Sequence, residues 1–264
     1  MNKKLFLSAG ISAILCLAVA QPSFATPTTI TDGYWGGEDH GYGDVIGRNS
    51  WFDIISMDVK RKDDILSVTI NTNFAGRSGS YTRLTNNNIS NGKGIAYGDL
   101  FLSDAWTPDE SASRYANDNY LTGTAWSYAF SLDDRWSNTG GTGTLYSLTG
   151  DDSDTLLSED FLSSGTFRNG QEIAVNTGMK GSNETFQNGS WDVVADTDST
   201  VGKINFMIDL TGTSLAQSDT IALHWGMTCG NDTIEGEYAV PEPAILGLLA
   251  LGLIGVGVSQ RRKI

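Results

Sequence analysis

The chain has 264 residues and a formal net charge of −14, from 31 acidic and 17 basic side chains. A surface this acidic repels nucleic acid and anionic lipid head groups, so we expect no nucleic-acid partner. Hydrophobic residues make up 39% of the chain, which is enough to build a core, so disorder is not expected.

The first 25 residues have the layout of a secretory signal peptide. Two lysines precede a mostly apolar run over 5–20, and Ser23-Phe24-Ala25 supplies the small residues of a cleavage site. We therefore expect signal peptidase to cut between Ala25 and Thr26. A lipoprotein signal at Cys16 is the alternative, but a leucine precedes this cysteine where a small residue would be expected.

A first candidate site is the loop over 32–44, which is rich in aromatic, glycine and acidic residues. Exposed Trp35 and Tyr42 would stack against sugar rings, and Asp39 and Asp44 would hold hydroxyl groups or calcium. In the alternative interpretation, which we favour, the segment folds over the edge of the domain. The aromatic residues then fill the core and the acids form turns.

Alternating apolar and polar residues predict strands along most of the chain. The strongest alternation covers 66–70, 126–132, 204–210 and 221–227, and weaker runs cover 51–59, 95–103, 144–148, 171–175 and 190–195. Turns are expected at 91–92, 140–143 and 188–189, where glycine is frequent. Many strands without an amphipathic helix predict an all-β fold, an antiparallel β-sandwich of the jelly-roll or lectin-like kind.

Acidic clusters recur at 151–154 and 196–198. Asp152 and Asp154 are candidate calcium ligands, although neither cluster has the glycine and glutamate spacing of an EF-hand loop. Solvated turns are the alternative interpretation. Calcium is the one cofactor that the sequence leaves open.

His224 and Cys229 suggest a metal site or a nucleophile pair, because they lie five residues apart. A closed zinc site needs four ligands, and the only other histidine is His40. Cys16 leaves with the signal peptide, so Cys229 has no disulfide partner. Five residues along one strand would place the pair on opposite faces. We therefore favour a last core strand that ends in an Asn-Asp turn.

The last residues, 240–264, combine Pro-Glu-Pro, an apolar stretch and a basic end. The two prolines delay the start of a helix to Ala244. The apolar stretch 244–258 would span only about 22 Å as a helix, short of a hydrocarbon core of about 30 Å. It is therefore a marginal permanent anchor. The basic end should stay cytoplasmic, with the rest of the chain outside.

This order of parts resembles the PEP-CTERM sorting signal of Gram-negative bacteria. The resemblance implies recognition through Pro241, Glu242, Pro243, Arg261 and Arg262. It also implies a C-terminal transmembrane helix that anchors the protein transiently in the inner membrane until an exosortase processes it. The processed protein would then reach the outer surface or the cell exterior.

These features divide the chain into a signal peptide (1–25), an all-β extracellular domain (26–239) and the sorting signal (240–264). The domain carries 12 basic and 30 acidic residues, a net charge of −18. It contains no nucleophile elbow, zinc-protease motif or phosphate loop. We therefore expect a non-catalytic surface or matrix protein associated with exopolysaccharide or biofilm. A lectin-like adhesin that binds carbohydrate or calcium is the alternative. An enzyme that acts on polysaccharide through two catalytic carboxyl groups is the third hypothesis.

Overall fold

Strands dominate the part of the chain that the structure describes. The computed structural model describes residues 27–34, 36, 43–80, 88–89, 93–109, 115, 117–164, 167–178, 185–197 and 200–240. Its α-helices within these ranges are single turns, α1 (Asn49–Phe52) and α2 (Ser158–Phe161). The predicted all-β class is confirmed. No helix in this part is long and apolar enough to cross a membrane. The predicted C-terminal span lies outside the described residues.

Ten strands form one antiparallel sheet. In sheet order they are β1 (Thr28–Thr31), β2 (Ile54–Lys62), β3 (Ile65–Thr72), β12 (Gly202–Asp209), β11 (Thr185–Val194), β7 (Gly140–Ser147), β6 (Tyr128–Leu132), β5 (Leu100–Ser103), β13 (Thr220–Gly226) and β14 (Thr233–Ala239). Outside this sheet, β8 (Thr155–Leu157) pairs with β10 (Glu172–Val175), and β4 (Asn88–Ile89) pairs with β9 (Leu162–Ser164). Two 3-10 turns, η2 (Asp152–Asp154) and η3 (Ser214–Gln217), complete the fold.

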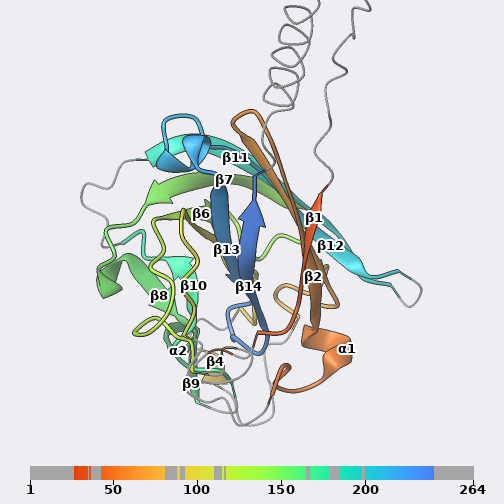
Figure 1. Ribbon diagram of the computed structural model, residues 1–264. Coiled ribbons are helices and arrows are strands. Elements are labelled where there is room, and N and C mark those ends of the chain that lie inside the picture. The colour runs from red at the N-terminus through yellow and green to blue at the C-terminus, as the bar shows by residue number, and fades with distance from the viewer. Residues whose placement is uncertain are drawn as a thin grey trace, which may run out of the picture.

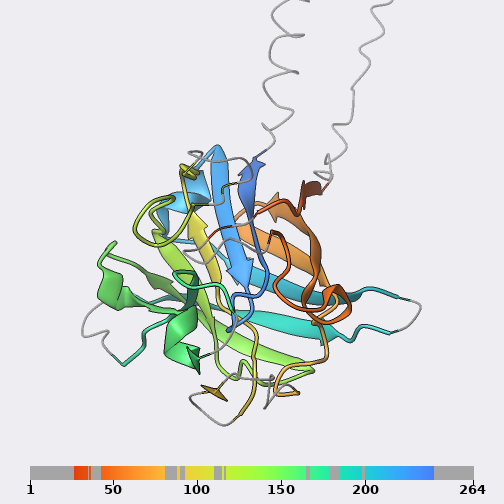
Figure 2. The ribbon, with the colours of Figure 1, turned by 90° about the horizontal axis from the view of Figure 1, so that it is seen from below.

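The large sheet curls until its edge strands β1 and β14 contact each other (Figure 1 and Figure 2). At this seam the side chain of Ile30 lies against Gly236, where a β-carbon would meet it at 2.7 Å. Asp232 ties the seam together, because its Oδ2 accepts a hydrogen bond of 2.6 Å from the backbone N–H of Ile54. Ten of the described strands therefore form one nearly closed, barrel-shaped sheet, and two packed sheets of the predicted sandwich kind are not seen among the described strands.

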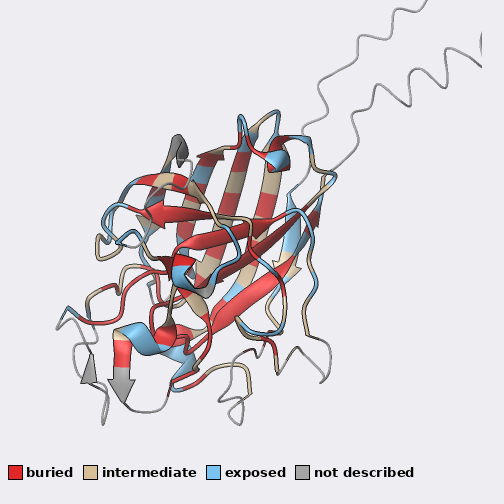
Figure 3. Ribbon diagram, turned by 90° about the vertical axis from the view of Figure 1, so that its left-hand side faces the viewer, coloured by how far each residue is buried: buried red, intermediate tan, exposed pale blue. Residues whose placement is uncertain are grey.

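The inner face of the curled sheet holds the main core. Figure 3 shows buried residues alternating with more exposed ones along the strands. The predicted inward series is confirmed for Val68, Phe206 and Leu223, which are almost completely buried in this core. Trp126 differs from the prediction. It precedes β6 and packs with Phe101 in a second, smaller cluster on the outer face of the sheet. Strand β10 contacts β6 on that face.

Two of the expected turns are wrong, because their glycines lie inside strands. Residues 140–143 begin β7, and Gly189 lies within β11, directly opposite Gly143. The ring of Phe130 fills the space above both glycines. A β-carbon on Gly143 would lie 2.5 Å from this ring, and one on Gly189 would lie 2.7 Å from it. Glycine is therefore used here for close approach of a side chain to the backbone.

We expect Gly189→Ala to lower the free energy of unfolding by about 1–3 kcal/mol, because the added methyl group would lie 2.5 Å from the carbonyl oxygen of Met207 and 2.7 Å from the ring of Phe130. Denaturant titration measures this change. Gly178→Ala is the matched control, since the nearest atom to a β-carbon there is 3.7 Å away. The control should leave stability unchanged or slightly raised. Equal stability of the two variants would contradict the proposed packing role.

Candidate functional site

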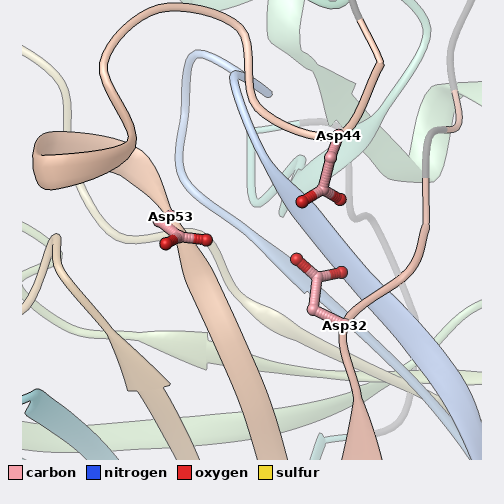
Figure 4. A group of neighbouring side chains, drawn as sticks. All are labelled: Asp32, Asp44 and Asp53. Atoms are coloured by element: carbon pink, nitrogen blue, oxygen red, sulfur yellow. The ribbon is translucent and has the colours of Figure 1, made fainter.

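Three carboxylates from three segments meet at one end of the sheet. Asp32 follows β1, Asp44 lies in the next loop, and Asp53 stands between α1 and β2. One oxygen of each lies within 4.8 Å of the others, and Figure 4 shows Asp32 and Asp44 pointing toward each other. We call this group the carboxylate trio. The pairing of Thr31 with Ser56 places the end of β1 beside the start of β2.

Burial and the charge of Asp44 favour the protonated forms of Asp32 and Asp53. Burial, followed by the charge of Asp44, raises the pKa of Asp32 to about 8. The same two causes raise the pKa of Asp53. Asp32 Oδ2 is a buried atom, and no donor within the described ranges reaches it. Asp232 lies close to the trio and is fully buried. Its burial and the charge of Asp32 raise the pKa of Asp232 well above its usual value.

Arg168 brings a positive charge beside these acids. Its side chain is fully buried, and Nη2 donates to the carbonyl oxygens of Gly43 at 2.9 Å and Asp44 at 2.6 Å. Burial lowers the pKa of Arg168, and the nearby carboxylates, led by Asp232, oppose that shift. The guanidinium therefore holds the loop that carries Asp44 in place.

The trio has two chemical options. Carboxylate oxygens are the ligands that calcium prefers, and calcium takes six to eight oxygens at about 2.3–2.6 Å. The trio would supply part of such a shell, with backbone carbonyls and water completing it. Without a cation, Asp32 keeps its proton at neutral pH, because its pKa lies near 8.

A buried polar network lies on the outer face of the sheet. His224 and Glu235 are direct cross-strand partners on β13 and β14, with Nδ1 and Oε2 3.2 Å apart. The other imidazole nitrogen lies 3.0 Å from the carbonyl oxygen of Glu172 on β10. Trp106 Nε1 donates to Glu235 Oε1 at 2.7 Å. Both His224 nitrogens are thus engaged by protein groups, so the network serves to hold β10 and the Trp106 loop against the sheet.

A pocket of about 180 Å³ opens beside this network. It lies between segments 120–126 and 148–155 and β10, and its lining includes Trp126, Asp151, Asp154 and Glu172. Asp154 Oδ2 accepts hydrogen bonds from the backbone N–H and the hydroxyl of Thr149, at 2.5 and 2.7 Å. This region combines an aromatic side chain with several carboxylates, so it suits a small polar ligand.

The predicted site residues fall in different places. Asp44 belongs to the carboxylate trio, and Asp154 lines the pocket. Asp152 begins η2. The other predicted site residues lie outside the described part of the chain, namely Ala25, Thr26, Trp35, Asp39, Tyr42, Pro241, Glu242, Pro243, Arg261 and Arg262.

His224 and Cys229 do not form a joint site. His224 packs edge-on against Phe101 in the outer cluster, whereas Cys229 belongs to the main core. Complete burial raises the pKa of Cys229 to about 12, so its thiol stays protonated and unreactive. The two side chains lie in different clusters, but the prediction that they share one strand is wrong, because β13 ends at Gly226 and Cys229 lies in the turn that follows. Met227 and the buried turn 228–232 follow β13.

Several residues of these sites carry no local sequence signal. Asp53 comes nine residues after Asp44, and Glu235 lies in a strand that the alternation did not predict. Asp32 is the first residue of the aromatic loop 32–44, so its position in an acidic segment was a usable sequence signal. Arg168 could have been singled out only as a cation amid uncharged residues.

Comparison with known proteins bears on the C-terminus. Residues 239–263 match the family model described as the PEP-CTERM protein-sorting motif. The chain carries a PEP-CTERM sorting motif. This motif implies export and processing by exosortase. No curated protein and no solved structure matches the chain. The PEP-CTERM assignment therefore rests on the tail, and the β domain has to be interpreted from its own geometry.

Proposed function

We propose that this protein is an exported, non-catalytic component of the cell surface or extracellular matrix, associated with exopolysaccharide or biofilm. The observation that carries the proposal is the PEP-CTERM motif, whose first matched residue, Ala239, is also the last residue of β14. The motif would anchor the domain transiently in the inner membrane. After exosortase processing, the domain would reach the outer surface or the exterior.

The placement of the chain ends supports this arrangement. β1 begins and β14 ends at the same end of the sheet, the upper end in Figure 1. The carboxylate trio lies at the opposite end, where β1 ends and β2 begins. An anchored domain would thus stand on one end and present the trio away from the membrane. A net charge of −18 on residues 26–239 would keep it off anionic lipid.

A lectin-like adhesin that binds calcium or carbohydrate is the second candidate. The observation that favours it is the convergence of Asp32, Asp44 and Asp53. Calcium commonly joins strands and loops of extracellular domains through such oxygen ligands.

Intact-mass analysis of protein recovered from the cell exterior tests the proposal. We expect a chain that starts at Thr26 and lacks the residues beyond about Pro243. Replacing Pro241, Glu242 and Pro243 together by alanine should leave the tail in place, because exosortase would no longer recognise it. Exported wild-type protein that still carries residues 261–264 would contradict the proposed processing.

A further inference from the structure

The pocket beside Trp126 has room for one small ring. Its volume is about 180 Å³. Pockets for drug-sized ligands are larger, about 300–1,000 Å³. Three chain segments that are distant in sequence build its wall, namely 120–126, 148–155 and the start of β10. A ligand of one ring, or one terminal unit of a polymer, matches this size.

The aromatic part of the wall is held rigidly. The ring of Trp126 packs against His224, with centroids 5.6 Å apart, and against Phe101 at 6.4 Å. His224 is itself fixed by contacts at both nitrogens. Only 7% of Trp126 remains exposed, and the residue lines the pocket together with Tyr120 and Leu148. A ligand would therefore meet a preformed apolar surface, which limits the entropy lost on binding.

The polar part of the wall accepts hydrogen bonds. Asp151, Asp154 and Glu172 line the pocket, and none of the described residues that line it is a lysine, arginine or histidine. The backbone N–H of Ser153 donates to Asp151 at 2.9 Å and lowers the pKa of this exposed carboxyl, which keeps it ionised at neutral pH. A ligand that fits must bring donors. An anionic ligand would meet these carboxylates and the −18 charge of the domain.

We propose that this pocket binds one pyranose ring that offers hydroxyl or ammonium donors, as in a neutral or amine-bearing glycan, and that it rejects acidic sugars. Trp126 would contact the apolar face of the ring, and the carboxylates of Asp151, Asp154 and Glu172 would accept from its polar groups. The inference rests on the proposed association with exopolysaccharide, which would supply the polymer. It adds the class of sugar that the domain would bind.

Saturation-transfer difference NMR on the full chain tests this inference with glucose, glucosamine and glucuronate at millimolar concentration. We expect transfer to glucose and glucosamine and none to glucuronate. Ala125→Leu fills the pocket from an exposed lining position and should abolish the transfer. Ala105→Leu adds the same side chain at an exposed position outside the lining and should change nothing. Unchanged melting temperatures of both variants show that the fold is intact.

A charge variant probes the polar wall. Asp151→Asn should weaken glucosamine binding about tenfold, because one charge-assisted hydrogen bond is lost. Glucose binding should weaken less. Binding of glucuronate as strong as that of glucose would overturn the inference, and so would full binding by Ala125→Leu or no binding of any ring. If the tail is processed but no sugar binds, only this inference fails. If sugars bind but the tail is retained, only the proposed function fails.

Discussion

Replacing Trp225 by alanine should lower the free energy of unfolding by about 3–5 kcal/mol. Trp225 is fully buried in the main core on β13, and its Nε1 donates to the carbonyl oxygen of Gly98 at 3.1 Å. The change creates a cavity and leaves that carbonyl without its donor, which adds to the loss. A domain of this kind has a total stability of about 5–15 kcal/mol, so the variant should be close to unfolding.

Two controls separate packing from the hydrogen bond. Trp225→Phe keeps most of the ring volume and removes the donor, so it should be intermediate. Met207→Ala truncates a side chain on β12 that is 56% exposed, and it should stay within about 0.5 kcal/mol of wild type. Denaturant titration of all three measures the differences. A loss below about 1 kcal/mol for Trp225→Ala would rule out a central place for β13 in the core.

The periodicity that predicted β13 also predicted most of the large sheet. Runs such as 204–210 and 221–227 alternate in sequence. In β12 one face meets the core and the other is more exposed. In β13 both faces are buried, but the inward positions carry large apolar residues and the outward ones carry Ala222 and His224. Alternation in one strand cannot tell whether the strands belong to two sheets or to one sheet that curls. The difference depends on the seam, where Asp232 reaches Ile54 across 178 residues of sequence.

Strand β14 escaped prediction because its pattern is unusual. Both faces of Thr233–Gly236 are buried, one in the main core and the other under the loops that hold Glu235, so polar and apolar residues do not mark inside and outside. The glycines led to the opposite error, a turn predicted where a strand is found. Gly143 and Gly189 leave space for the ring of Phe130 and do not form a turn. Contacts between residues distant in sequence determine both the burial of β14 and the role of these glycines. The local sequence pattern gives no information about such contacts.

The same limit applies to the candidate sites. The acidic loop at 32–44 directed attention to the correct region, and Asp44 is part of the trio. Asp53 joins it only because β1 pairs with β2, a long-range event. The pocket collects Trp126, Asp151 and Glu172 from three segments, so neither its aromatic wall nor its charge could be read from one stretch of sequence.

The stability of the domain should fall as pH rises between about 4 and 8. Asp32 and Asp118 are buried acids, and burial raises the pKa of each to about 8, with added repulsion from Asp44 and Glu235 respectively. In the unfolded chain such groups ionise near pH 3.9. Within this window the folded state therefore binds more protons than the unfolded state, so the free energy of unfolding decreases with pH. Each group contributes at most about 1.4 kcal/mol per pH unit.

Asp32→Asn isolates the contribution of the trio. The amide does not titrate, so the slope of the free energy of unfolding between pH 5 and 7 should become shallower by up to about 1.4 kcal/mol per pH unit. The remaining slope belongs to Asp118 and to the other shifted acids, Asp53 and Asp232. Asp104→Asn is the control, because this side chain is exposed. If Asp32→Asn and Asp104→Asn both kept the wild-type dependence of the free energy of unfolding on pH, the proposed electrostatic role of the trio would be contradicted.

Calcium should reverse the loss of stability at pH 8, where the carboxylates of the trio are most easily ionised. A cation that binds only the folded state stabilises it by RT ln(1 + [L]/Kd), whereas ionic strength screens all charges alike. Millimolar calcium should therefore raise the melting temperature more than sodium chloride of equal ionic strength. Asp32→Asn combined with Asp44→Asn should remove that difference. Equal shifts in the two salts for the wild-type chain would count against a metal in the trio. A calcium-specific shift that survives this double variant, but disappears in Asp152→Asn with Asp154→Asn, would place the ion at the second acidic loop.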